Sequence, residues 1–318
     1  MDQRLPVIIF AYNRPNHLDS TLKSLSENIE AKNASITIYC DGPRTKSNES
    51  DRDKVKAVRE IAKIYKRKKV FSEMEIIERD TNLGLANSII MGVTESIEKN
   101  GRVIVLEDDM ITHPTFLTYM KNGLEMYKND KNVASIHGHS FPILQSLPET
   151  YFMRGAGWWG WATWERAWSI FEKDGNILLK KLYSEKLDTE FDYNNSWFYT
   201  ETLREQTEGL NNSWAIRWHA STFMAGMLTL YPGRSLIKNI GFDGSGTHCR
   251  NDYGLVGPIS TKPIKVERIA ISEIPHIRGW ISEFLAQANK QRRWPIARRW
   301  YRIMRKKINM LLEKKCAL

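Results

Sequence analysis

The chain has 318 residues, enough for one large α/β domain or for two smaller domains packed closely together. With 42% hydrophobic residues its composition is ordinary for a globular protein, and it contains no apolar run of about eighteen residues that would span a bilayer. The N-terminus lacks the hydrophobic core of a signal peptide. Cys40, Cys249 and Cys316 have no paired spacing, which argues against a disulfide framework or a zinc knuckle and fits a reducing cytoplasm.

The formal net charge of +10 belongs mostly to the C-terminal segment. Residues 292–315 contain ten Lys and Arg residues against a single acid, Glu313, so the remaining body is almost neutral. Because the basic residues are confined to one segment, the overall charge does not indicate that the protein binds nucleic acid.

Strand and helix patterns alternate through the first part of the chain. Buried strands are predicted over residues 7–10 and 103–106, and further strands over residues 36–39 and 75–78. Helices are predicted near residues 18–25, over about 51–67 and over 89–97. Repeated strand–helix units predict an α/β fold with a mostly parallel sheet and right-handed crossovers. From about residue 140 the sequence becomes aromatic and loop-rich, which indicates a second half packed on the same sheet.

Polar residues follow the predicted strands directly. They are Asn13, Arg14, Asp41, Asn82, Asp108 and Asp109. Ligands of open parallel sheets bind at the carboxyl ends of the strands. The sequence therefore predicts a ligand site at this edge of the sheet.

The acidic triplet Glu107, Asp108 and Asp109 ends the fourth predicted strand. Adjacent carboxylates repel one another, and a divalent cation such as Mn²⁺ or Mg²⁺ relieves that repulsion through oxygen ligands. The same ion can bind a diphosphate at its open positions. The alternative is a solvated acidic turn, or a set of helix N-caps before residues 113–115.

Two segments of the sequence resemble a known family. The stretch Val103–Phe116 (VIVLEDDMITHPTF) resembles the metal-binding strand end of GT-A-fold glycosyltransferases, especially the N-acetylglucosaminyltransferase I type. Pro6–Pro15 (PVIIFAYNRP) is similar to the first strand of that family with its nucleotide-contacting Arg. This similarity implicates Arg14 and, beside it, Tyr12 and Asn13 in binding the nucleotide.

Further segments follow in the order of that family. Asp41 matches the acid that contacts the nucleoside base, and Asn82 lies in a segment that resembles the one near the donor. The stretch Gly241–His248 (GFDGSGTH) is similar to the late glycine-rich loop that closes over the donor diphosphate. Met153–Trp168 resembles the Gly-Trp-Gly-Trp-Ala-Thr-Trp signature of bacterial relatives. The resemblance spans about residues 5–255.

The resemblance implies a Rossmann-like GT-A fold, a mostly parallel sheet flanked by helices. Residues 1–138 would form the nucleotide-sugar half, residues 139–285 the acceptor half of the same domain, and residues 286–318 a basic C-terminal tail. The implied activity is a metal-dependent, inverting transfer of a hexosyl or N-acetylhexosaminyl group from a UDP-sugar. The implied acceptor is a glycan or a lipid-linked saccharide in cell-surface polysaccharide synthesis.

The glycine-rich loop also has a direct physical interpretation. Its glycines let backbone N–H groups approach a phosphate closely, with Gly246 and Thr247 as contacts to the donor. His248 would join Asp109 as a ligand of the cation. Such a loop can order as a lid when the donor binds, although a plain flexible turn has the same composition.

Five tryptophans lie close together, at positions 158, 159, 161, 164 and 168. Flat aromatic rings stack on the apolar C–H faces of sugars, which favours Trp158 and Trp159 as acceptor-binding residues. The spacing of Trp161, Trp164 and Trp168 is also that of a helix stripe facing a core, and Trp164 and Trp168 are expected to be structural.

The catalytic base is not evident from the sequence. An inverting transferase needs a carboxylate that deprotonates the acceptor hydroxyl. In the resembled family that acid belongs to a tryptophan-flanked pair, and the matching stretch here, residues 213–218, contains no acid. Glu165 is the first substitute, followed by Glu201 and Asp243. His137 and His139 can also face the site or be packed in the core.

The C-terminal tail carries apolar residues near helical spacing between its basic residues. A basic amphipathic helix suits an anionic membrane surface, which predicts a cytoplasmic protein peripheral on the inner face of the cell membrane. An ordinary helix docked on the body or a dimer contact is the alternative. Three other functions stay open: a carbohydrate-binding protein without activity, a nucleotidyltransferase and, through the tail alone, a nucleic-acid-binding protein.

Overall fold

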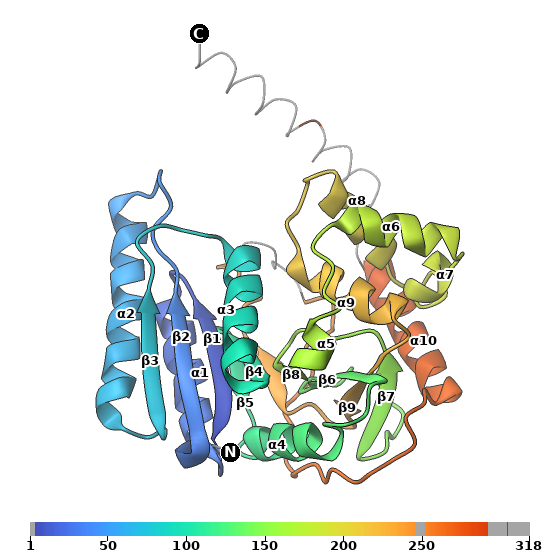
Figure 1. Cartoon of the computed structure of the whole chain (residues 1–318), viewed down its shortest axis with the longest axis horizontal. Helices are drawn as coiled ribbons and strands as arrows, with labels where there is room; N and C mark the ends of the chain where they lie inside the picture. The colour runs from blue at the N-terminus through green and yellow to red at the C-terminus, as the bar shows by residue number, and fades with distance from the viewer. Residues whose placement is uncertain (1–3, 246–251, 292–303, 305–318) are drawn as a thin grey trace.

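The computed structural model describes residues 4–245, 252–291 and 304. Its strands are β1 (Leu5–Ala11), β2 (Ala34–Cys40), β3 (Glu73–Glu78), β4 (Arg102–Glu107), β5 (Met110–Thr112), β6 (Val133–His137), β7 (Thr150–Arg154), β8 (Trp161–Trp164), β9 (Leu228–Pro232) and β10 (Ile237–Asn239). One sheet of eight strands in the order β3-β2-β1-β4-β8-β6-β9-β7 runs through both halves of the chain, and β10 pairs with β5 in a small second sheet (Figure 1).

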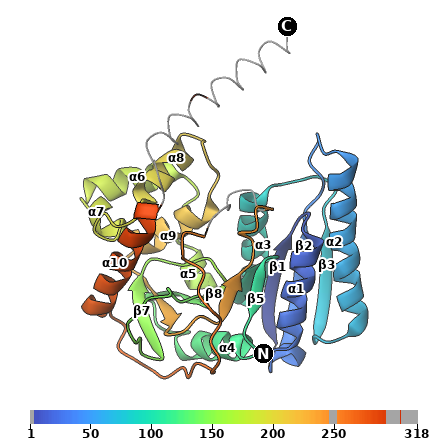
Figure 2. The ribbon, with the colours of Figure 1, turned by 180° about the vertical axis from the view of Figure 1, so that it is seen from behind.

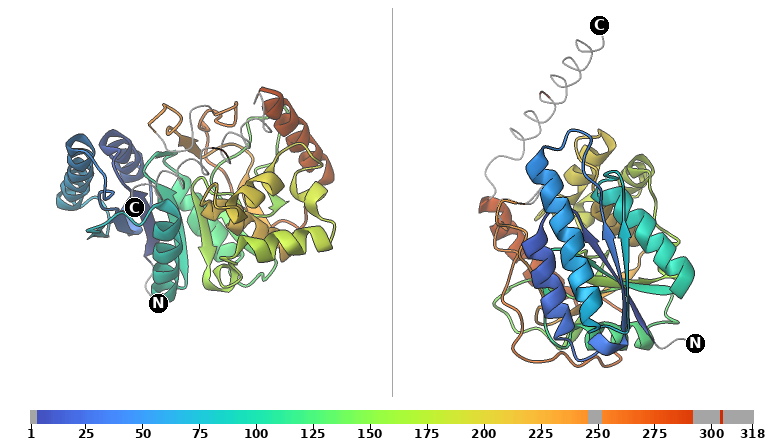
Figure 3. Two further views of the ribbon diagram at one scale, coloured as in Figure 1. Left: turned by 90° about the horizontal axis from the view of Figure 1, so that it is seen from above. Right: turned by 90° about the vertical axis from the view of Figure 1, so that its left-hand side faces the viewer.

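The helices are α1 (Pro15–Ser26), α2 (Glu49–Lys68), α3 (Leu85–Asn100), α4 (Phe116–Met126), α5 (Glu165–Trp168), α6 (Gly175–Ser184), α7 (Asp188–Phe191), α8 (Tyr199–Thr207), α9 (Trp214–Met224) and α10 (Pro275–Gln291). A short 3-10 turn covers Ala31–Asn33. Figure 3 shows α1 and α2 on one side of the sheet and α3 on the other. The predicted α/β fold, a mostly parallel sheet flanked by helices, is confirmed.

The burial of β1 explains its central place in the sheet. Every residue of this strand is buried. Val7 and Ile9 belong to the core cluster beneath α1 and α2, whereas Ile8 and Phe10 belong to the cluster beneath α3. Because successive side chains of a strand point to opposite faces, a continuous apolar run such as this one needs cover on both sides.

The first four strands of the large sheet are parallel, with β1 between β2 and β4 and with β3 beyond β2. The chain leaves β1 toward β2 and β3 and then returns through α3 to β4 on the other side of β1. The strand order therefore reverses between β1 and β4. In open α/β sheets this switch point is where the loops after two neighbouring strands diverge and leave a crevice.

The second half of the sheet contains antiparallel pairs. Strand β8 is antiparallel to both β4 and β6, and β7 is antiparallel to β9. Helix α10 packs beside β7 and buries Ile277, Ile281 and Leu285 in a third core cluster (Figure 2).

The helical interpretation of the tryptophan spacing is wrong for Trp161 and Trp164, because Trp161–Trp164 form strand β8. In a strand, residues an odd number apart point to opposite faces. Trp161 accordingly packs in the cluster beneath α3, and Trp164 packs in the opposite one. Helix α5 follows at once and brings Trp168 back against Trp161, with ring centres 6.0 Å apart. Trp164 and Trp168 are buried, as expected of structural residues, and Trp161 is buried as well.

Within residues 4–245 and 252–291, none of the helices combines the length and the apolar composition that crossing a bilayer requires. The predicted membrane-binding tail falls almost entirely on residues 292–318, which apart from Met304 lie outside the described part of the chain.

Candidate active site

Arg14 meets Asp108 and Asp109 at the switch point of the sheet. Arg14 comes directly after β1 and precedes α1, and the two acids come directly after the neighbouring parallel strand β4. Arg14 Nη1 lies 2.9 Å from Asp109 Oδ2. Its Nη2 pairs with Asp108 Oδ1, and its Nε donates to Asp108 Oδ2 at 3.4 Å. The residues that the sequence places after two different strands are thus in direct contact.

One guanidinium faces three acidic side chains at this point. Burial and the charge of Asp109 raise the pKa of Asp108 and of the adjacent Glu107, and Arg14 opposes both shifts. Burial lowers the pKa of Arg14, but Asp108 and Asp109 more than offset this effect and raise it above its usual range. Arg14 therefore stays charged, and the cluster can still accept positive charge.

The carboxylate of Asp109 has a free oxygen. Its Oδ2 is paired with Arg14, while Oδ1 is buried and has no hydrogen-bond partner. A hard divalent cation takes oxygen ligands of this kind and completes its shell with water and phosphate oxygens. Within the described part of the chain no three His, Cys, Asp or Glu side chains are grouped as a ready metal cage. The residues present thus fit a cation held by one or two carboxylates together with a bound diphosphate.

The start of the glycine-rich loop packs on these acids. Strand β10 pairs with β5, and Ile240 N–H donates to the carbonyl oxygen of Asp109 at 2.9 Å. At Gly241 a Cβ atom would stand 2.1 Å from Asp109 Oδ2 and 3.0 Å from Arg14 Nη1. Only a residue without a side chain lets the loop approach this closely.

Asp243 lies at the edge of the same cluster. Its Oδ2 is 3.2 Å from His17 Nε2, and Oδ1 accepts hydrogen bonds from the Ser245 hydroxyl and backbone N–H. These hydrogen bonds lower the pKa of Asp243, so its half-exposed carboxylate is ionised. Gly246, Thr247 and His248, the predicted donor and metal contacts further along the loop, lie outside the described residues.

Asp41 and Asn82 hold two neighbouring loops together. The Asp41 carboxylate accepts backbone N–H groups of Gly42, Leu83 and Gly84 at 2.9 to 3.0 Å. The Asn82 side chain donates to the Gly42 carbonyl oxygen at 3.0 Å. Both side chains therefore fix the shape of the loops after β2 and β3, beside the switch point.

Tyr12 and Asn13, predicted to contact the nucleotide, are half-buried in the loop between β1 and α1. The guanidinium carbon of Arg44 lies 5.5 Å from the centre of the Tyr12 ring. The predicted nucleotide residues of the described chain thus occupy the loops at the carboxyl ends of β1, β2, β3 and β4.

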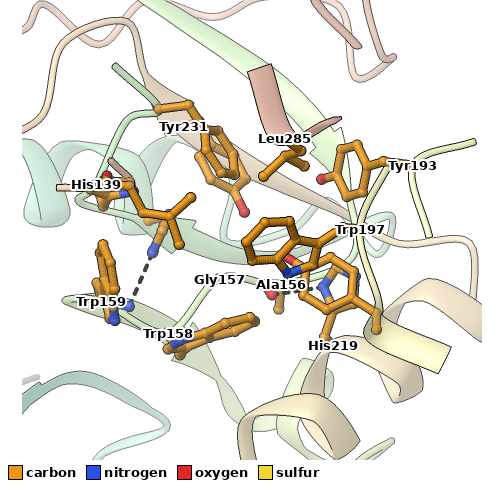
Figure 4. A pocket seen from close by; sticks show the side chains of 14 residues that line it. His139, Ala156, Gly157, Trp158, Trp159, Tyr193, Trp197, His219, Tyr231 and Leu285 are labelled. Atoms are coloured by element: carbon orange, nitrogen blue, oxygen red, sulfur yellow. Dashed lines mark hydrogen bonds between the residues drawn. The ribbon is translucent and has the colours of Figure 1, made fainter. Parts of the chain in front are cut away.

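A separate cavity lies in the aromatic half of the molecule, where Trp158 and Trp159 line one side of it (Figure 4). It holds about 550 Å³ of empty space, part of it open to solvent. The rings of Trp159 and Phe242 pack edge to face with centres 5.6 Å apart. Since Phe242 directly follows Gly241, this contact places the cavity next to the acidic cluster.

The other lining residues come from strands, helices and loops of the second half. They are His137, His139, Phe141, Ala156, Gly157, Tyr193, Trp197, Tyr199, His219, Tyr231, Leu255 and Leu285. His137 and His139, for which the sequence left open a site position or a core position, are both buried and both line the cavity.

Glu165, the first candidate for the catalytic base, lies at the wrong edge of the sheet. Strand β8 runs antiparallel to β4, so Trp164 pairs with Arg102 and the Glu165 N–H donates to Gly101 O at 3.0 Å. Asp108 is six residues further along β4, about 20 Å away at roughly 3.3 Å per residue. Glu165 is therefore too far from the acidic cluster to act in a reaction there.

Glu201 lies in the first turn of α8 and pairs with Arg204 at 2.6 Å. It is not among the residues that line the aromatic cavity. Of the three predicted bases, Asp243 lies at the edge of the acidic cluster, and the ring of its chain neighbour Phe242 contacts Trp159 at the cavity.

Several residues at these sites carry no signal in the sequence. Thr21 donates its hydroxyl to the Asp108 carbonyl oxygen at 2.7 Å and accepts Met110 N–H, so it fixes the acidic turn from α1. The sequence does not single out His17 or His219 either, since an isolated His on a helix is usually packed or solvated. The spacing of Gly155 and Gly157, which flank Ala156, was the one available hint of a close backbone contact.

Comparison with known proteins gives only distant structural similarity. No model of a protein family matches the sequence, and no curated protein is similar to it. The mannosyltransferase PcManGT from Pyrobaculum calidifontis, solved with GDP-Man and Mn²⁺, is 14% identical, with a TM-score of 0.29 over 42% of this chain and 35% of that chain. S. aureus TarS is 14% identical, with a TM-score of 0.32 over 46% of this chain and 24% of that chain.

A UDP-glucose pyrophosphorylase complexed with UDP-glucose is 13% identical, with a TM-score of 0.32 over 54% of this chain and 82% of that chain. The alignments thus span about a third of the length of the mannosyltransferase and about a quarter of TarS. Similarity at this level concerns the arrangement of strands and helices and decides nothing about activity.

Proposed function

We propose that the chain is a metal-dependent glycosyltransferase that moves a sugar from a nucleoside diphosphate donor to a saccharide acceptor. The observation that carries this proposal is the contact of Arg14 with Asp108 and Asp109 at the switch point of the sheet. A buried group of acids with a free carboxylate oxygen, next to a guanidinium and a glycine, suits a cation and a diphosphate.

Arg14 and Asp109 divide the binding of the donor between them. Asp109 would hold the Mn²⁺ or Mg²⁺ ion through its free Oδ1, with Asp108 beside it. When bound, the ion supplies positive charge that stabilises the departing nucleoside diphosphate. Arg14 is the only cation in direct contact with Asp108 and Asp109 among the described residues. When the donor binds, the N–H groups of Arg14 would donate to phosphate oxygens in place of the carboxylate oxygens.

Gly241 sets how closely the donor is enclosed. Its backbone packs directly on Asp109 and Arg14 without a side chain, so the diphosphate would lie beside this contact and not between the loop and Asp109. Gly246, Thr247 and His248, the other proposed contacts to the donor and the cation, follow in the sequence of this loop. Asp41 and Asn82 act on the nucleoside indirectly, because their polar atoms are already bound to the backbone of the loops that would contact it.

Asp243 is the proposed base for an inverting transfer. Its carboxylate is ionised, half-exposed and adjacent to Phe242, which contacts the aromatic cavity. A carboxylate in this position can take the proton of an acceptor hydroxyl as that hydroxyl attacks the donor sugar. His17, 3.2 Å from Asp243, orients the carboxylate.

The identity of the donor, a UDP-sugar of a hexose or an N-acetylhexosamine, stays part of the proposal. So do the lipid-linked or polysaccharide acceptor, the cytoplasmic location and the contact of the C-terminal tail with an anionic membrane. The division into a nucleotide-sugar half over residues 1–138 and an acceptor half over residues 139–285 belongs to the same proposal.

A donor screen with the full chain tests the activity. UDP-sugars and GDP-sugars are incubated with the protein with and without Mn²⁺, and the released products are identified. Metal-dependent release of a nucleoside diphosphate supports the proposal. Release of pyrophosphate instead indicates a nucleotidyltransferase, and the binding of saccharides without any nucleotide binding indicates a carbohydrate-binding protein; either result contradicts the proposal.

A further inference from the structure

The aromatic cavity presents no ionised group to a ligand. Its fourteen lining residues, all within the described part of the chain, include no Asp, Glu, Lys or Arg. Its three histidines are neutral, because burial lowers the pKa of His137 well below its usual range and that of His139 and His219 to about 4. A ligand of this cavity would therefore be uncharged where it touches these residues.

The hydrogen bonds of His137 determine its tautomer. Its Nε2 accepts the backbone N–H of Trp159 at 3.1 Å, so this nitrogen carries the lone pair. In a neutral imidazole the proton is then on Nδ1. Nδ1 is buried and has no partner. His137 therefore contributes an unused hydrogen-bond donor.

His219 has the opposite arrangement. Its Nδ1 lies 2.9 Å from the carbonyl oxygen of Ala156, and since a carbonyl oxygen can only accept, Nδ1 carries the proton. Nε2 is buried, has no partner and carries the lone pair. His219 therefore contributes an unused hydrogen-bond acceptor.

Two glycines hold these rings in place. A Cβ atom at Gly157 would stand 2.4 to 2.6 Å from three atoms of the His137 ring. A Cβ atom at Gly155 would stand 2.4 to 3.1 Å from three atoms of the His219 ring. The segment between β7 and β8 thus runs between the two imidazoles in direct contact with both. Both unused nitrogens are buried on rings that contact this segment, and leaving them without partners costs free energy unless a ligand binds them.

We propose that this cavity binds an uncharged sugar ring, with His137 Nδ1–H donating to one hydroxyl and His219 Nε2 accepting from another. A sugar hydroxyl both donates and accepts, and the C–H faces of the ring pack on aromatic side chains such as Trp158, Trp159 and Trp197 (Figure 4). A carboxylate or phosphate finds no cation here, and the lone pair of His219 repels it.

This assignment rests on the proposed function, in which the sugar ring is part of the acceptor. The rings of Trp159 and Phe242 join the cavity to the loop that covers Asp109, which places a bound saccharide beside the donor. The consequence is a specificity: the terminal ring of the acceptor is a neutral hexose or N-acetylhexosamine and not a uronic acid.

Titration of the full chain tests the inference. Methyl β-glucoside, methyl β-galactoside and methyl N-acetyl-β-glucosaminide are compared with methyl β-glucuronide and with the nucleoside uridine, by saturation-transfer NMR and calorimetry. We expect at least one neutral glycoside to bind, and the glucuronide and uridine not to bind in the cavity. Binding of the glucuronide as tight as that of the neutral glycosides, or the absence of any neutral glycoside binding, overturns the inference.

Two substitutions each remove one unused ring nitrogen and keep the hydrogen bond that the other ring nitrogen makes. His137→Gln retains an acceptor for the Trp159 N–H and loses the Nδ1–H donor. His219→Asn retains a donor to the Ala156 carbonyl oxygen and loses the Nε2 acceptor. Each is expected to weaken binding of the neutral glycoside about three- to tenfold, the net effect of one hydrogen bond. The exposed His276, replaced as His276→Asn, is the matched control and leaves the affinity unchanged.

The unmutated protein gives a second readout in case a variant does not fold. The imidazole ¹⁵N resonance of His219 Nε2 should move upfield when a sugar hydroxyl donates to it; a saturating glycoside that leaves this resonance unmoved contradicts the assignment. Binding of UDP with Mn²⁺, measured on the same samples, separates the two proposals. Saccharide binding without UDP binding contradicts the proposed transferase, and UDP binding without saccharide binding contradicts only the cavity assignment.

Discussion

The two candidate sites differ in the charge of the side chains that form them. At the switch point, three acids and Arg14 lie together, and burial raises the pKa values of Glu107 and Asp108. In the aromatic cavity, three histidines are kept neutral by burial. The two proposals accordingly assign a cation and an anionic ligand to the first site and an uncharged ligand to the second.

This difference matches the needs of a transfer between two substrates. A nucleoside diphosphate donor brings negative charge that has to be neutralised, and a saccharide brings hydroxyls and apolar ring faces. Phe242 lies between the two sites, with its chain neighbour Gly241 on Asp109 and its own ring on Trp159. The comparison can be tested by changes that affect one site and leave the other intact.

The largest effect is expected for Asp109→Asn. This change keeps the size of the side chain and removes the charge that would hold the cation. Loss of several kcal/mol of electrostatic stabilisation lowers metal-dependent donor turnover about 10²- to 10³-fold. The measurement is release of nucleoside diphosphate across a Mn²⁺ titration.

Asp53→Asn is the matched control for this variant, because Asp53 is an exposed acid that pairs only with the neighbouring Lys56 in the described structure. It should turn over donor like the unmodified chain. An Asp109→Asn variant with unchanged metal-dependent turnover would place the cation elsewhere.

Gly241→Ala tests the close approach of the glycine-rich loop. The added Cβ would stand 2.1 Å from Asp109 Oδ2, so the loop or the carboxylate must shift. Overpacking of this kind costs about 1–3 kcal/mol, which predicts a loss of donor affinity of roughly ten- to a hundredfold. Calorimetry with UDP and Mn²⁺ measures it, and saccharide binding in the cavity should persist.

Gly279→Ala provides the control glycine. Gly279 is exposed within α10, and its added Cβ meets no atom within 4 Å. It should raise the free energy of unfolding by up to about 1 kcal/mol through helix propensity and leave UDP affinity unchanged. Equal affinity in the Gly241→Ala variant would show that the loop can move away without consequence.

The parallel half of the fold, and the position of Arg14 and Asp108 at one edge of the sheet, could be predicted from the sequence. Four short strand patterns that contain Ile or Val are followed by polar residues, and parallel strands bring their carboxyl ends to one edge. These signals are local, so short windows reveal them. The roles given to the residues in binding remain predictions.

The antiparallel half could not be predicted, because it depends on the direction of strands and on distant pairings. Glu165 follows the tryptophan run in sequence, but the reversal of β8 carries it to the opposite edge from Asp108. Strand β10 reaches β5 from more than a hundred residues away and thereby brings Gly241 onto Asp109. The unused nitrogen of His219 follows from a hydrogen bond to Ala156, which no spacing in the sequence indicates.

The neutrality of the cavity predicts a pH dependence of stability. The folded-state pKa of His219 is about 4, below the ordinary value for an unfolded chain, about 6.5. Between these values the unfolded state binds more protons, so the stabilising contribution of a neutral His219 is lost as the pH falls from about 6.5 toward 4. At pH 5 this single group costs about 2 kcal/mol relative to neutral pH.

Asp108 and Glu107 act in the opposite direction, because their raised pKa values favour the folded state as they become protonated. The informative quantity is therefore a difference between variants. The His219→Asn variant should lose about 2 kcal/mol less than the unmodified chain when urea unfolding at pH 7 is compared with unfolding at pH 5. Identical pH slopes would mean that His219 is charged or solvated in the folded protein.

The smallest effect concerns the connection between the two sites. Phe242→Leu keeps an apolar side chain and removes the edge-to-face contact with Trp159, whose ring centre is 5.6 Å away. Such a pair contributes about 0.5–1.5 kcal/mol beyond its buried area, so the coupling between the sites should fall by roughly two- to tenfold. The readout is the ratio of sugar transfer to donor hydrolysis at a fixed concentration of acceptor. If Phe242 aligns the saccharide with the donor, transfer decreases while hydrolysis continues, because water needs no alignment by the cavity. A proportional decrease of both rates would instead assign Phe242 to the donor site alone.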